Sequence, residues 1–393
     1  MVASLLAVTS IFGQNHNQGA CTPQPPVCKP AKCCLPQVPQ PPMNCAYNAP
    51  AEINVGCQGD IDFFASGSFL YWQPILENMS IAYVNTTNVF LAAPERSLQG
   101  SFVDMNFKYK PGFKVGLGMN LQVDDWDGFT EYTRVHGEHR ASTNGGPDAN
   151  VPMVYPTFGH PFLLSHTIGA SAVFNSASAT YNNNLDFVDA EMGRTYYVGK
   201  SLIFRSAWGA RGSWITQHVH VNYNNFTSLV ATDPAGVIVS INSSVDVYQR
   251  QRSWGVGPRT GLMMDWMLGQ GVRFFGSGYG DILYHKFKIQ DKTVAIPRIN
   301  RGSLLIGNPI SVVSYEKVGA LRTHLDLEMG FGWGSYFDNN NWHIDLSASY
   351  GWQVFFDHNM FRSFTDDFVI GNNHIPNGNL YVHGLTVTAR VDF

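Results

Sequence analysis

Charged residues are scarce in this 393-residue chain, where Asp, Glu, Lys and Arg make up 14% of the composition, about half of what an ordinary soluble domain carries. No run of about 18 apolar residues occurs either, which excludes a bundle of membrane-spanning helices. The net charge of −4 provides no basic surface for nucleic acid. No cysteine follows residue 57, and no boundary between soluble domains is visible after about residue 60.

Aromatic residues, by contrast, reach 13% of the chain, and 38 residues are glycine. The aromatics lie in short segments that alternate apolar and polar residues, with Asn, Asp and Gly between the segments. Such alternation predicts strands with one apolar and one polar face. A weakly charged, aromatic-rich chain of alternating strands is typical of a transmembrane β-barrel, whose outside meets lipid and whose inside is wet.

The first 60 residues differ from the rest. Residues 1–20 begin with the apolar stretch MVASLLAVTSIFG, whose length predicts an export signal, although a basic start is missing. Residues 21–60 are rich in proline and hold all six cysteines: Cys21, Cys28, Cys33, Cys34, Cys45 and Cys57. An exported chain meets an oxidising compartment, so we expect a periplasmic arm with disulfides to distant or intermolecular partners. Zinc is the weaker interpretation, because no Cys-x-x-Cys pair occurs, and we expect no metal or cofactor.

The clearest predicted hairpin joins residues 324–333 to residues 342–353 through the turn DNNN. The apolar side of the hairpin has Trp333 and Trp342 at one limit and Tyr350 and Trp352 at the other, like the aromatic girdles at membrane interfaces. Residues 113–121, 202–214 and 254–266 alternate in the same way, whereas the alternation is ambiguous between Val272 and Lys288.

Connection lengths give a strand count. Short turns near 122–125, 198–201, 268–271 and 337–341 alternate with long connections near 85–100, 137–178, 221–245, 289–319 and 357–379. Bacterial barrels have short periplasmic turns and long external loops. With a first strand over 61–84, the sequence predicts an all-β, antiparallel up-and-down barrel of about ten strands over 61–393, with both ends in the periplasm. A hidden hairpin in 138–178 would give twelve strands, and pairing within several loops would give sixteen. Pro258 lies inside a strand and predicts a bulge, since a closed barrel has no free edge.

The final strand, LYVHGLTVTARVDF, carries a regular apolar face made of Tyr381, Leu385, Val387, Ala389, Val391 and Phe393. A terminal aromatic after such a face resembles the assembly signal of outer-membrane proteins, which implies the barrel-assembly machinery as a partner. The segments GSFLYWQ, PGFKVGLGMN, WDGFTEYTRVHG, RSAWGARGSWI, WGVGPRTGLMMDW, LDLEMGFGWG and LTVTARVDF, in this order, resemble the Legionella-type pore-forming outer-membrane protein family over residues 61–393. That family includes major outer membrane protein (MOMP)-like proteins of chlamydia-related bacteria. The cysteine-rich arm lies outside the match and resembles the disulfide cross-linking of chlamydial envelopes.

Charged residues on the inward faces are candidate lumen residues: Lys114, Asp127, Glu131, Arg205, Arg211, Arg259, Asp326, Glu328, Asp345 and Arg390. Charged rings in a lumen select permeating ions, but charges can also pair across strands and fill a narrow interior. For any single residue the sequence favours pairing across strands, whereas the set together favours a wet lumen. His218 and His220 share a strand face, and we expect an exposed pair at the external rim rather than a metal site.

Two functions compete. The first is a porin in the outer membrane that passes ions and small hydrophilic solutes by passive diffusion. The second is a structural or adhesive envelope protein with a plugged barrel, because ten strands make a small bore. An enzyme is not expected, since no Gly-x-Ser-x-Gly elbow or comparable signature occurs. The expected partners are outer-membrane lipid, further copies of the chain in a homo-oligomer, and other envelope proteins through disulfides.

Overall fold

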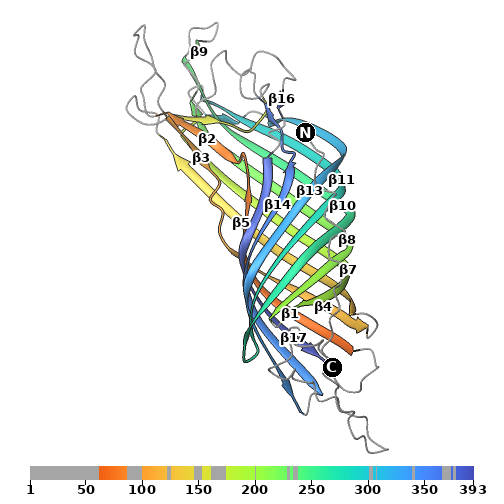
Figure 1. Cartoon of the computed structure of the whole chain (residues 1–393). Helices are drawn as coiled ribbons and strands as arrows, with labels where there is room; N and C mark the ends of the chain where they lie inside the picture. The colour runs from red at the N-terminus through yellow and green to blue at the C-terminus, as the bar shows by residue number, and fades with distance from the viewer. Residues whose placement is uncertain are drawn as a thin grey trace, which may run out of the picture.

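Ten strands form one closed antiparallel barrel in the computed structural model (Figure 1). The structure describes residues 62–85, 100–121, 125–145, 153–160, 174–199, 201–227, 231–232, 238–300, 304–306, 308–338, 341–364, 373–374 and 378–393. The six cysteines and residues 1–60 lie outside this part. The barrel strands are β1 (Asp62–Leu76), β4 (Lys110–Leu121), β5 (Trp126–Asn144), β7 (Ser176–Val198), β8 (Leu202–Thr227), β10 (Ile238–Gly269), β11 (Val272–Asn300), β13 (Ile310–Phe337), β14 (Trp342–Asn359) and β17 (Gly378–Asp392).

The seam between β1 and β17 closes the sheet. Their register runs from Phe64 opposite Asp392 to Leu76 opposite Leu380. At the end of the seam, the Phe393 N–H donates to the Phe63 carbonyl at 2.8 Å, and the Phe63 N–H donates back at 3.1 Å. Closure gives the backbone groups of both strands partners, which a bilayer requires. The prediction of a ten-stranded up-and-down barrel is confirmed, and the alternatives of twelve and sixteen strands are wrong.

The barrel presents its apolar side outward. On β13, Leu327 is 57% exposed whereas the neighbouring Asp326 is 7% exposed. A soluble barrel shows the opposite arrangement, so this outer surface, which we call the lipid band, faces hydrocarbon. Aromatic residues mark both limits of the band: Trp266, Trp333 and Trp342 near the short turns, and Trp214, Trp254, Tyr284 and Trp352 toward the long connections.

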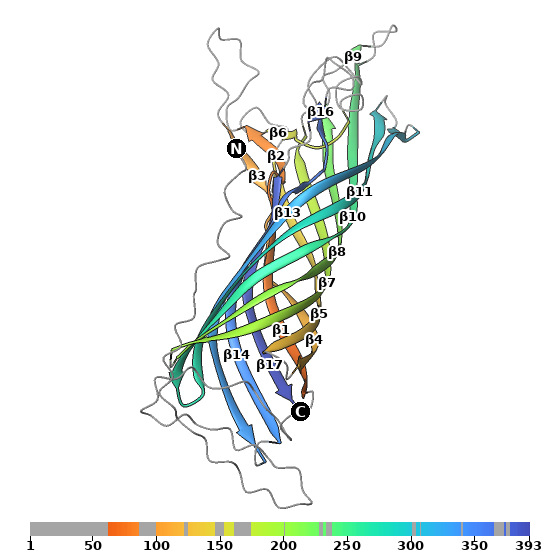
Figure 2. The same cartoon turned by 45° about the vertical axis from the view of Figure 1, so that its right-hand side comes forward.

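Several strands continue far past the lipid band at the external end, where the long connections lie (Figures 1 and 2). Strand β10 has 32 residues and β11 has 29, whereas about 9–11 residues cross a bilayer. The predicted loops at 221–245 and 289–319 are therefore wrong in large part, because pairing continues there, for example between Tyr248 and Lys292. Above the membrane the outer face meets water and the inner face packs in the interior, so the outward apolar residues that mark a strand in lipid disappear while the backbone ladder persists.

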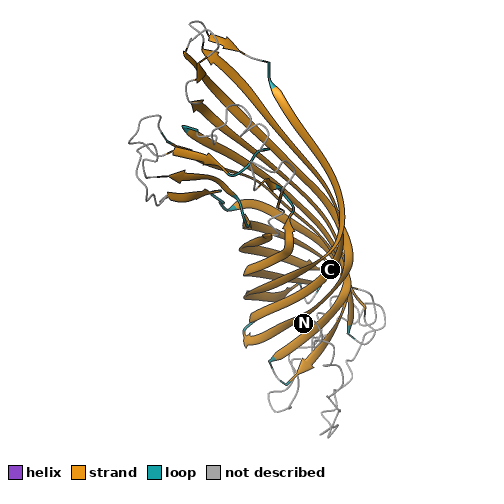
Figure 3. Cartoon of the chain, turned by 90° about the horizontal axis from the view of Figure 1, so that it is seen from above, coloured by secondary structure: helices purple, strands orange, loops and turns teal. Residues whose placement is uncertain are grey.

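The external end also carries a small sheet that is separate from the barrel sheet and packs against inward-facing residues of the barrel. The predicted first strand divides, since β1 ends at Leu76 and the chain turns at Asn78, which has a φ of 59°. Strand β2 (Ser80–Asn85) then pairs with β3 (Gly100–Asp104) and β6 (Met153–Pro156). The short strands β9 (Ala231–Thr232), β12 (Leu304–Ile306), β15 (Ser363–Phe364) and β16 (Asn373–His374) complete this end. Seen from above, the described chain is strand and loop (Figure 3), and it contains no helix long and apolar enough to cross a membrane.

Pro258 produces no bulge, contrary to the prediction. Val256 lies opposite Tyr284 and Arg259 lies opposite Asp281, so one register holds on both sides of the proline. The ladder to β11 is interrupted at Gly257 and Pro258 instead, because proline has no N–H to donate. The two backbones come close here, and a Cβ at Gly257 would lie 1.9 Å from the Ile282 carbonyl oxygen.

An arginine placed on the lipid band tests the orientation of the barrel. We expect Leu327→Arg to lower the free energy of unfolding by about 2–4 kcal/mol, because the charge would sit in hydrocarbon. The matched control is Tyr315→Arg, on the same strand and face but beyond the band, where the side chain is 76% exposed; its effect should stay within about 0.5 kcal/mol. Urea titration in lipid vesicles measures both, and equal losses would contradict the lipid band.

Candidate functional site

The ten charged residues predicted to line the lumen all lie on the inner faces of barrel strands, and each contacts a polar partner. They form two networks inside the membrane-spanning part of the barrel. A central network surrounds Asp281, and a second network lies nearer the periplasmic turns.

Asp281 on β11 is the centre of the first network. Its carboxylate accepts a hydrogen bond from Arg259 Nη1 at 3.1 Å, lies 3.3 Å from Arg211 Nη1, and lies 2.6 Å from His324 Nδ1. Arg211 also binds Asp189 in a fork, with Nε and Nη2 donating at 2.6 and 2.7 Å. Arginine's planar guanidinium suits this bidentate arrangement. Strands β7, β8, β10, β11 and β13 are thereby joined across the lumen.

The central network extends toward β4 and β5. Arg259 Nη2 donates to Asp326 at 3.2 Å, and its guanidinium lies 4.0 Å from the centre of the Tyr279 ring. Lys114 Nζ lies 3.1 Å from Glu131. Lys114 and Glu131 come from the adjacent strands β4 and β5, where Lys114 lies opposite Thr133 and Glu131 lies two residues away. Arg259 and Asp326 instead come from β10 and β13, which are not adjacent in the sheet.

The second network contains three arginines. Arg205 donates through Nε to Asp127 at 2.7 Å and through Nη1 to Glu191 at 2.7 Å. Arg273 donates to Asp265 at 3.1 Å and to Asp345 at 2.9 Å.

The remaining lumen charges complete the set. Arg390 donates to Asp392 at 2.5 Å, and His343 Nδ1 lies 3.0 Å from the same carboxylate. Glu328 accepts a hydrogen bond from the Ser349 hydroxyl. Together the two networks contain six cationic side chains and ten carboxylates: Lys114, Arg205, Arg211, Arg259, Arg273 and Arg390 against Asp127, Glu131, Asp189, Glu191, Asp265, Asp281, Asp326, Glu328, Asp345 and Asp392. The lumen they line is therefore acidic.

The lumen is closed at the level of the central network. The Arg211 side chain is 4% exposed, and the Asp281 side chain is 0% exposed. A continuous water-filled channel would leave these side chains wet. The charged groups thus close the bore by contacting one another, which the narrow interior of a ten-stranded barrel permits.

A second closure lies above the network. The sequence suggested a plugged barrel as an alternative but did not indicate which segment would form the plug. Near the end of β14 the chain turns at Asp357, whose φ is 49°, and residues 358–362, here called the plug, fold into the lumen. Gln251 donates to the His358 carbonyl at 2.7 Å and accepts from the Met360 N–H at 2.9 Å, while Gln249 donates to the Arg362 carbonyl at 2.7 Å. Two glutamines of β10 therefore hold the backbone of the plug.

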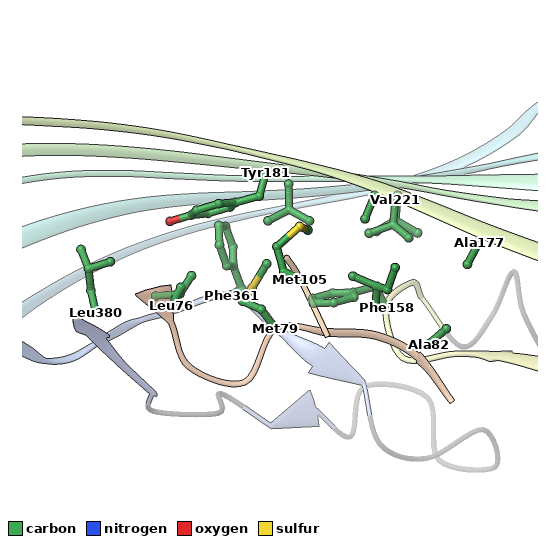
Figure 4. Packing of buried hydrophobic residues seen from close by; sticks show 14 of the residues in the cluster. Leu76, Met79, Ala82, Met105, Phe158, Ala177, Tyr181, Val221, Phe361 and Leu380 are labelled. Carbon is green, nitrogen blue, oxygen red and sulfur yellow. The ribbon is translucent and has the colours of Figure 1, made fainter. Parts of the chain in front are cut away.

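Apolar side chains fill the external half of the barrel around the plug. Figure 4 shows Leu76, Met79, Met105, Phe158 and Phe361 packed in one cluster. The inward face of the facing strands contributes further buried residues, including Tyr181 and Val221. This half of the interior resembles the core of a soluble domain, which is dry and close-packed.

Several residues of the two networks were not predicted from the sequence. Arg273 and Asp281 lie in the stretch with ambiguous alternation, where Phe274 faces outward while Phe275 faces inward. Asp189 lies on the inward face of β7. The alternation of inward and outward residues along that strand would have indicated this position. His218 and His220 lie on the outer face of β8, and the described residues hold no group of three His, Cys, Asp or Glu side chains suited to a metal ion.

The apolar face of the last strand points outward along β17. Leu385, Val387 and Phe393 are exposed there, and His383 on the same face contacts the Tyr350 hydroxyl at 2.7 Å. The role of this face in assembly stays a prediction.

Loss of the central carboxylate tests the network. We expect Asp281→Ala to lower the free energy of unfolding by about 3–5 kcal/mol, because it removes a shared carboxylate from two buried guanidinium groups. Glu138→Ala is the control, since Glu138 pairs with Arg140 at 2.6 Å on the exposed outer surface; its cost should stay below about 1 kcal/mol. Urea unfolding in vesicles gives both values. Similar costs for the two variants would mean that the network does not stabilise the barrel.

The chain matches the family described as Legionella pneumophila major outer membrane protein precursor over residues 60–393. No curated protein matches it significantly. Solved structures with a similar course include the outer membrane protease OmpT of Escherichia coli, at 10% identity and a TM-score of 0.33, covering 86% of this chain and 97% of that one. A FadL homologue of Pseudomonas aeruginosa has 5% identity, a TM-score of 0.23 and coverages of 85% and 90%. The toluene transporter TodX of P. putida has 8% identity, a TM-score of 0.23 and coverages of 84% and 89%. These values assign no role to any residue. The family match spans most of the chain, which therefore belongs to the Legionella pneumophila major outer membrane protein family and is an outer-membrane β-barrel protein.

Proposed function

We propose that this barrel is a gated pore that passes cations and small hydrophilic solutes by passive diffusion, and that the closed state is the one described above. The charged lining of the membrane-spanning lumen carries the proposal. Buried ion pairs are costly to desolvate, and replacing them with well-packed apolar residues is often neutral or stabilising. A barrel selected only for stability would gain nothing from sixteen charged groups in its interior, whereas a pore requires polar walls.

Opening requires movement of side chains and of the plug, while the strand pairing stays intact. The ion pairs can exchange partners, because Arg211 and Arg259 each contact more than one carboxylate. The plug is held in part by the side-chain hydrogen bonds from Gln249 and Gln251, each with a net contribution of about 0.5–1.5 kcal/mol. The excess of carboxylates over cations in the lumen supports a preference for cations.

Single-channel recording of the refolded protein in a planar bilayer tests the gate, beside a heat-denatured control. We expect brief openings for the native chain, and a higher open probability for Gln249→Ala/Gln251→Ala, which loses the side-chain bonds to the plug. Gln217→Ala is the matched control, because this inward glutamine donates to the Tyr181 hydroxyl at 2.9 Å and does not hold the plug. Identical open probabilities in all three proteins would contradict the gate.

Charge changes in the lumen test the selectivity. We expect Glu328→Gln to lower the cation preference measured as a reversal potential in a salt gradient, and charge reversal at Arg205, Arg211 or Arg259 to raise it, because these side chains set the lumen charge. Asp246→Asn on the outer face should have no effect, since this carboxylate contacts His220 and Asn222 outside the lumen. Unchanged currents and selectivity in all lumen variants would remove these residues from the pore.

The apolar cluster in the external half favours a second function, a structural or adhesive envelope protein with a permanently plugged barrel. In that case the long external connections contact molecules outside the cell. The cysteines of residues 21–60 cross-link the chain to further copies of itself or to other envelope proteins. Absence of current from the folded native chain and from the plug variant would favour this function. Oligomers that disappear on reduction, seen by non-reducing electrophoresis, would reveal the cross-links. Neither function requires the barrel to catalyse a reaction.

A further inference from the structure

Three basic residues form a row across the outer face of the barrel. Arg252 on β10 lies opposite Lys288 on β11, and Lys288 lies opposite Lys317 on β13. All three side chains are exposed. Directly opposed residues on neighbouring strands lie on the same face with Cβ atoms about 4.5–5.5 Å apart, so the register brings three positive charges together. We call them the basic row.

The basic row lies just beyond the external limit of the lipid band. Arg252 is two residues past Trp254, and Lys288 is four residues past Tyr284, whose rings belong to the external girdle. Lys286, between Tyr284 and Lys288, places its Nζ 5.5 Å from the centre of the Trp254 ring. Headgroup phosphates lie immediately outside the hydrocarbon, at the level where aromatic girdles end. The basic row therefore lies at headgroup level.

The charges of the row are not balanced within the described protein. Like charges directly opposite one another on neighbouring strands are destabilising, yet none of the three side chains forms an ion pair in the described residues. Farther along the same face, Asp246 is engaged by His220 at 3.0 Å and by Asn222 at 2.7 Å. In the lumen, several charged residues lie opposite a residue of the other sign on the neighbouring strand. The basic row differs because its opposed residues have the same sign, and an anion from outside the protein would reduce their repulsion.

A hollow of about 460 Å³, lined mostly by residues with polar groups, lies beside the row on the same outer face. Its lining includes Arg250, Lys292, His218 and Tyr248, and no carboxylate belongs to it. The Tyr248 ring stacks on His220 with centroids 4.3 Å apart and an angle of 3°. A flat aromatic surface beside hydrogen-bond donors can accommodate a sugar ring.

Beneath the row, the lipid band continues without interruption. Val256, Ile282 and Leu321 are exposed on the outer faces of the same three strands, where they can contact acyl chains. Toward the membrane centre, one ligand would therefore meet the hollow first, then the cations of the basic row, and then an apolar wall.

We propose that the basic row and the adjoining hollow bind a phosphorylated glycolipid of the outer leaflet, with its phosphates between Arg252, Lys288 and Lys317. Phosphate monoesters carry about −1.5 to −2 charges and three acceptor oxygens, which match three neighbouring cations. The apolar wall below the row distinguishes this ligand from a soluble phosphorylated peptide. The site is independent of conduction through the lumen.

Binding to the refolded full-length chain in detergent micelles tests the proposal, with diphosphoryl lipid A as the probe and native mass spectrometry as the measurement. We expect the triple variant Arg252→Gln/Lys288→Gln/Lys317→Gln to weaken lipid A binding by at least about 10-fold. The variant loses charge-assisted hydrogen bonds to phosphate, which are stronger than hydrogen bonds between neutral groups. Lys288→Arg/Lys317→Arg should retain it. Arg140→Gln is the control, because Arg140 is a basic residue on the outer face of β5 that already pairs with Glu138.

Comparison of probes identifies the ligand class. Diphosphoryl lipid A should bind more tightly than its monophosphoryl form, and both more tightly than phosphatidylglycerol or inorganic phosphate. Equal binding of phosphatidylglycerol would overturn the preference for a glycolipid, and equal binding of inorganic phosphate would overturn the lipid site. Undiminished lipid A binding by the triple Gln variant would overturn the role of the row.

Thermal unfolding supplies a second readout. In lipid-free micelles the triple Gln variant should unfold at a higher temperature than the native chain, because three opposed positive charges are lost. Added diphosphoryl lipid A should raise the unfolding temperature of the native chain more than that of the variant. A variant that is less stable in the absence of lipid would contradict the repulsion on which the proposal rests.

Discussion

Backbone hydrogen bonding across the β1–β17 seam is the constraint on which the remaining structure depends. In hydrocarbon every exposed N–H and carbonyl must find a partner within the protein, so a sheet of ten strands has to close on itself. Closure at ten strands leaves a bore that side chains can span. Phe187 on β7 stacks on Phe355 of β14 at 5.3 Å, and Arg211 on β8 contacts His324 of β13, although neither pair of strands is adjacent in the sheet. The interior is consequently packed like a core, and any conduction must begin with side-chain movement.

Both halves of the interior are filled by side chains, but the contacts between those side chains differ in kind. In the membrane-spanning half the contacts are ionic, and in the external half they are apolar around the plug. Ion pairs with several available partners can rearrange while each charge stays compensated, whereas an apolar cluster opens only by exposing its surface to water. The plug is therefore the more restrictive of the two closures. The plug also differs from the wall of the barrel in how it is held. Glutamine side chains bind its backbone, whereas the wall is held by continuous backbone hydrogen bonds between strands.

The outer wall was predictable from the sequence because lipid imposes a period of two on every strand that crosses it. The hairpin of β13 and β14 follows the alternation residue by residue, and the short turns fixed the number of strands. The stretch from Val272 to Lys288 was ambiguous because aromatic residues lie on both faces and Gly276, Gly278 and Gly280 take outward positions. Pairing across the lumen was not predictable, since Arg211 and His324 are 113 residues apart and meet only after closure. The plug has no period of its own, and nothing in residues 358–362 distinguished it from an ordinary loop.

Strand register also explains why charge is arranged so differently on the two sides of the wall. Inward, adjacent strands place Asp189 opposite Arg211 and Arg259 opposite Asp281, so each charge finds its opposite within the protein. Outward, the same geometry places Arg252, Lys288 and Lys317 side by side. The dielectric is high above the membrane and the repulsion is correspondingly modest, so the fold tolerates this row without a partner of its own. A surface that retains uncompensated charge at the boundary of the hydrocarbon is suited to an anion that the membrane itself supplies. The two proposals thus assign different electrostatic tasks to the two sides of the barrel wall: selection of permeating ions inside and anchorage in the lipid outside.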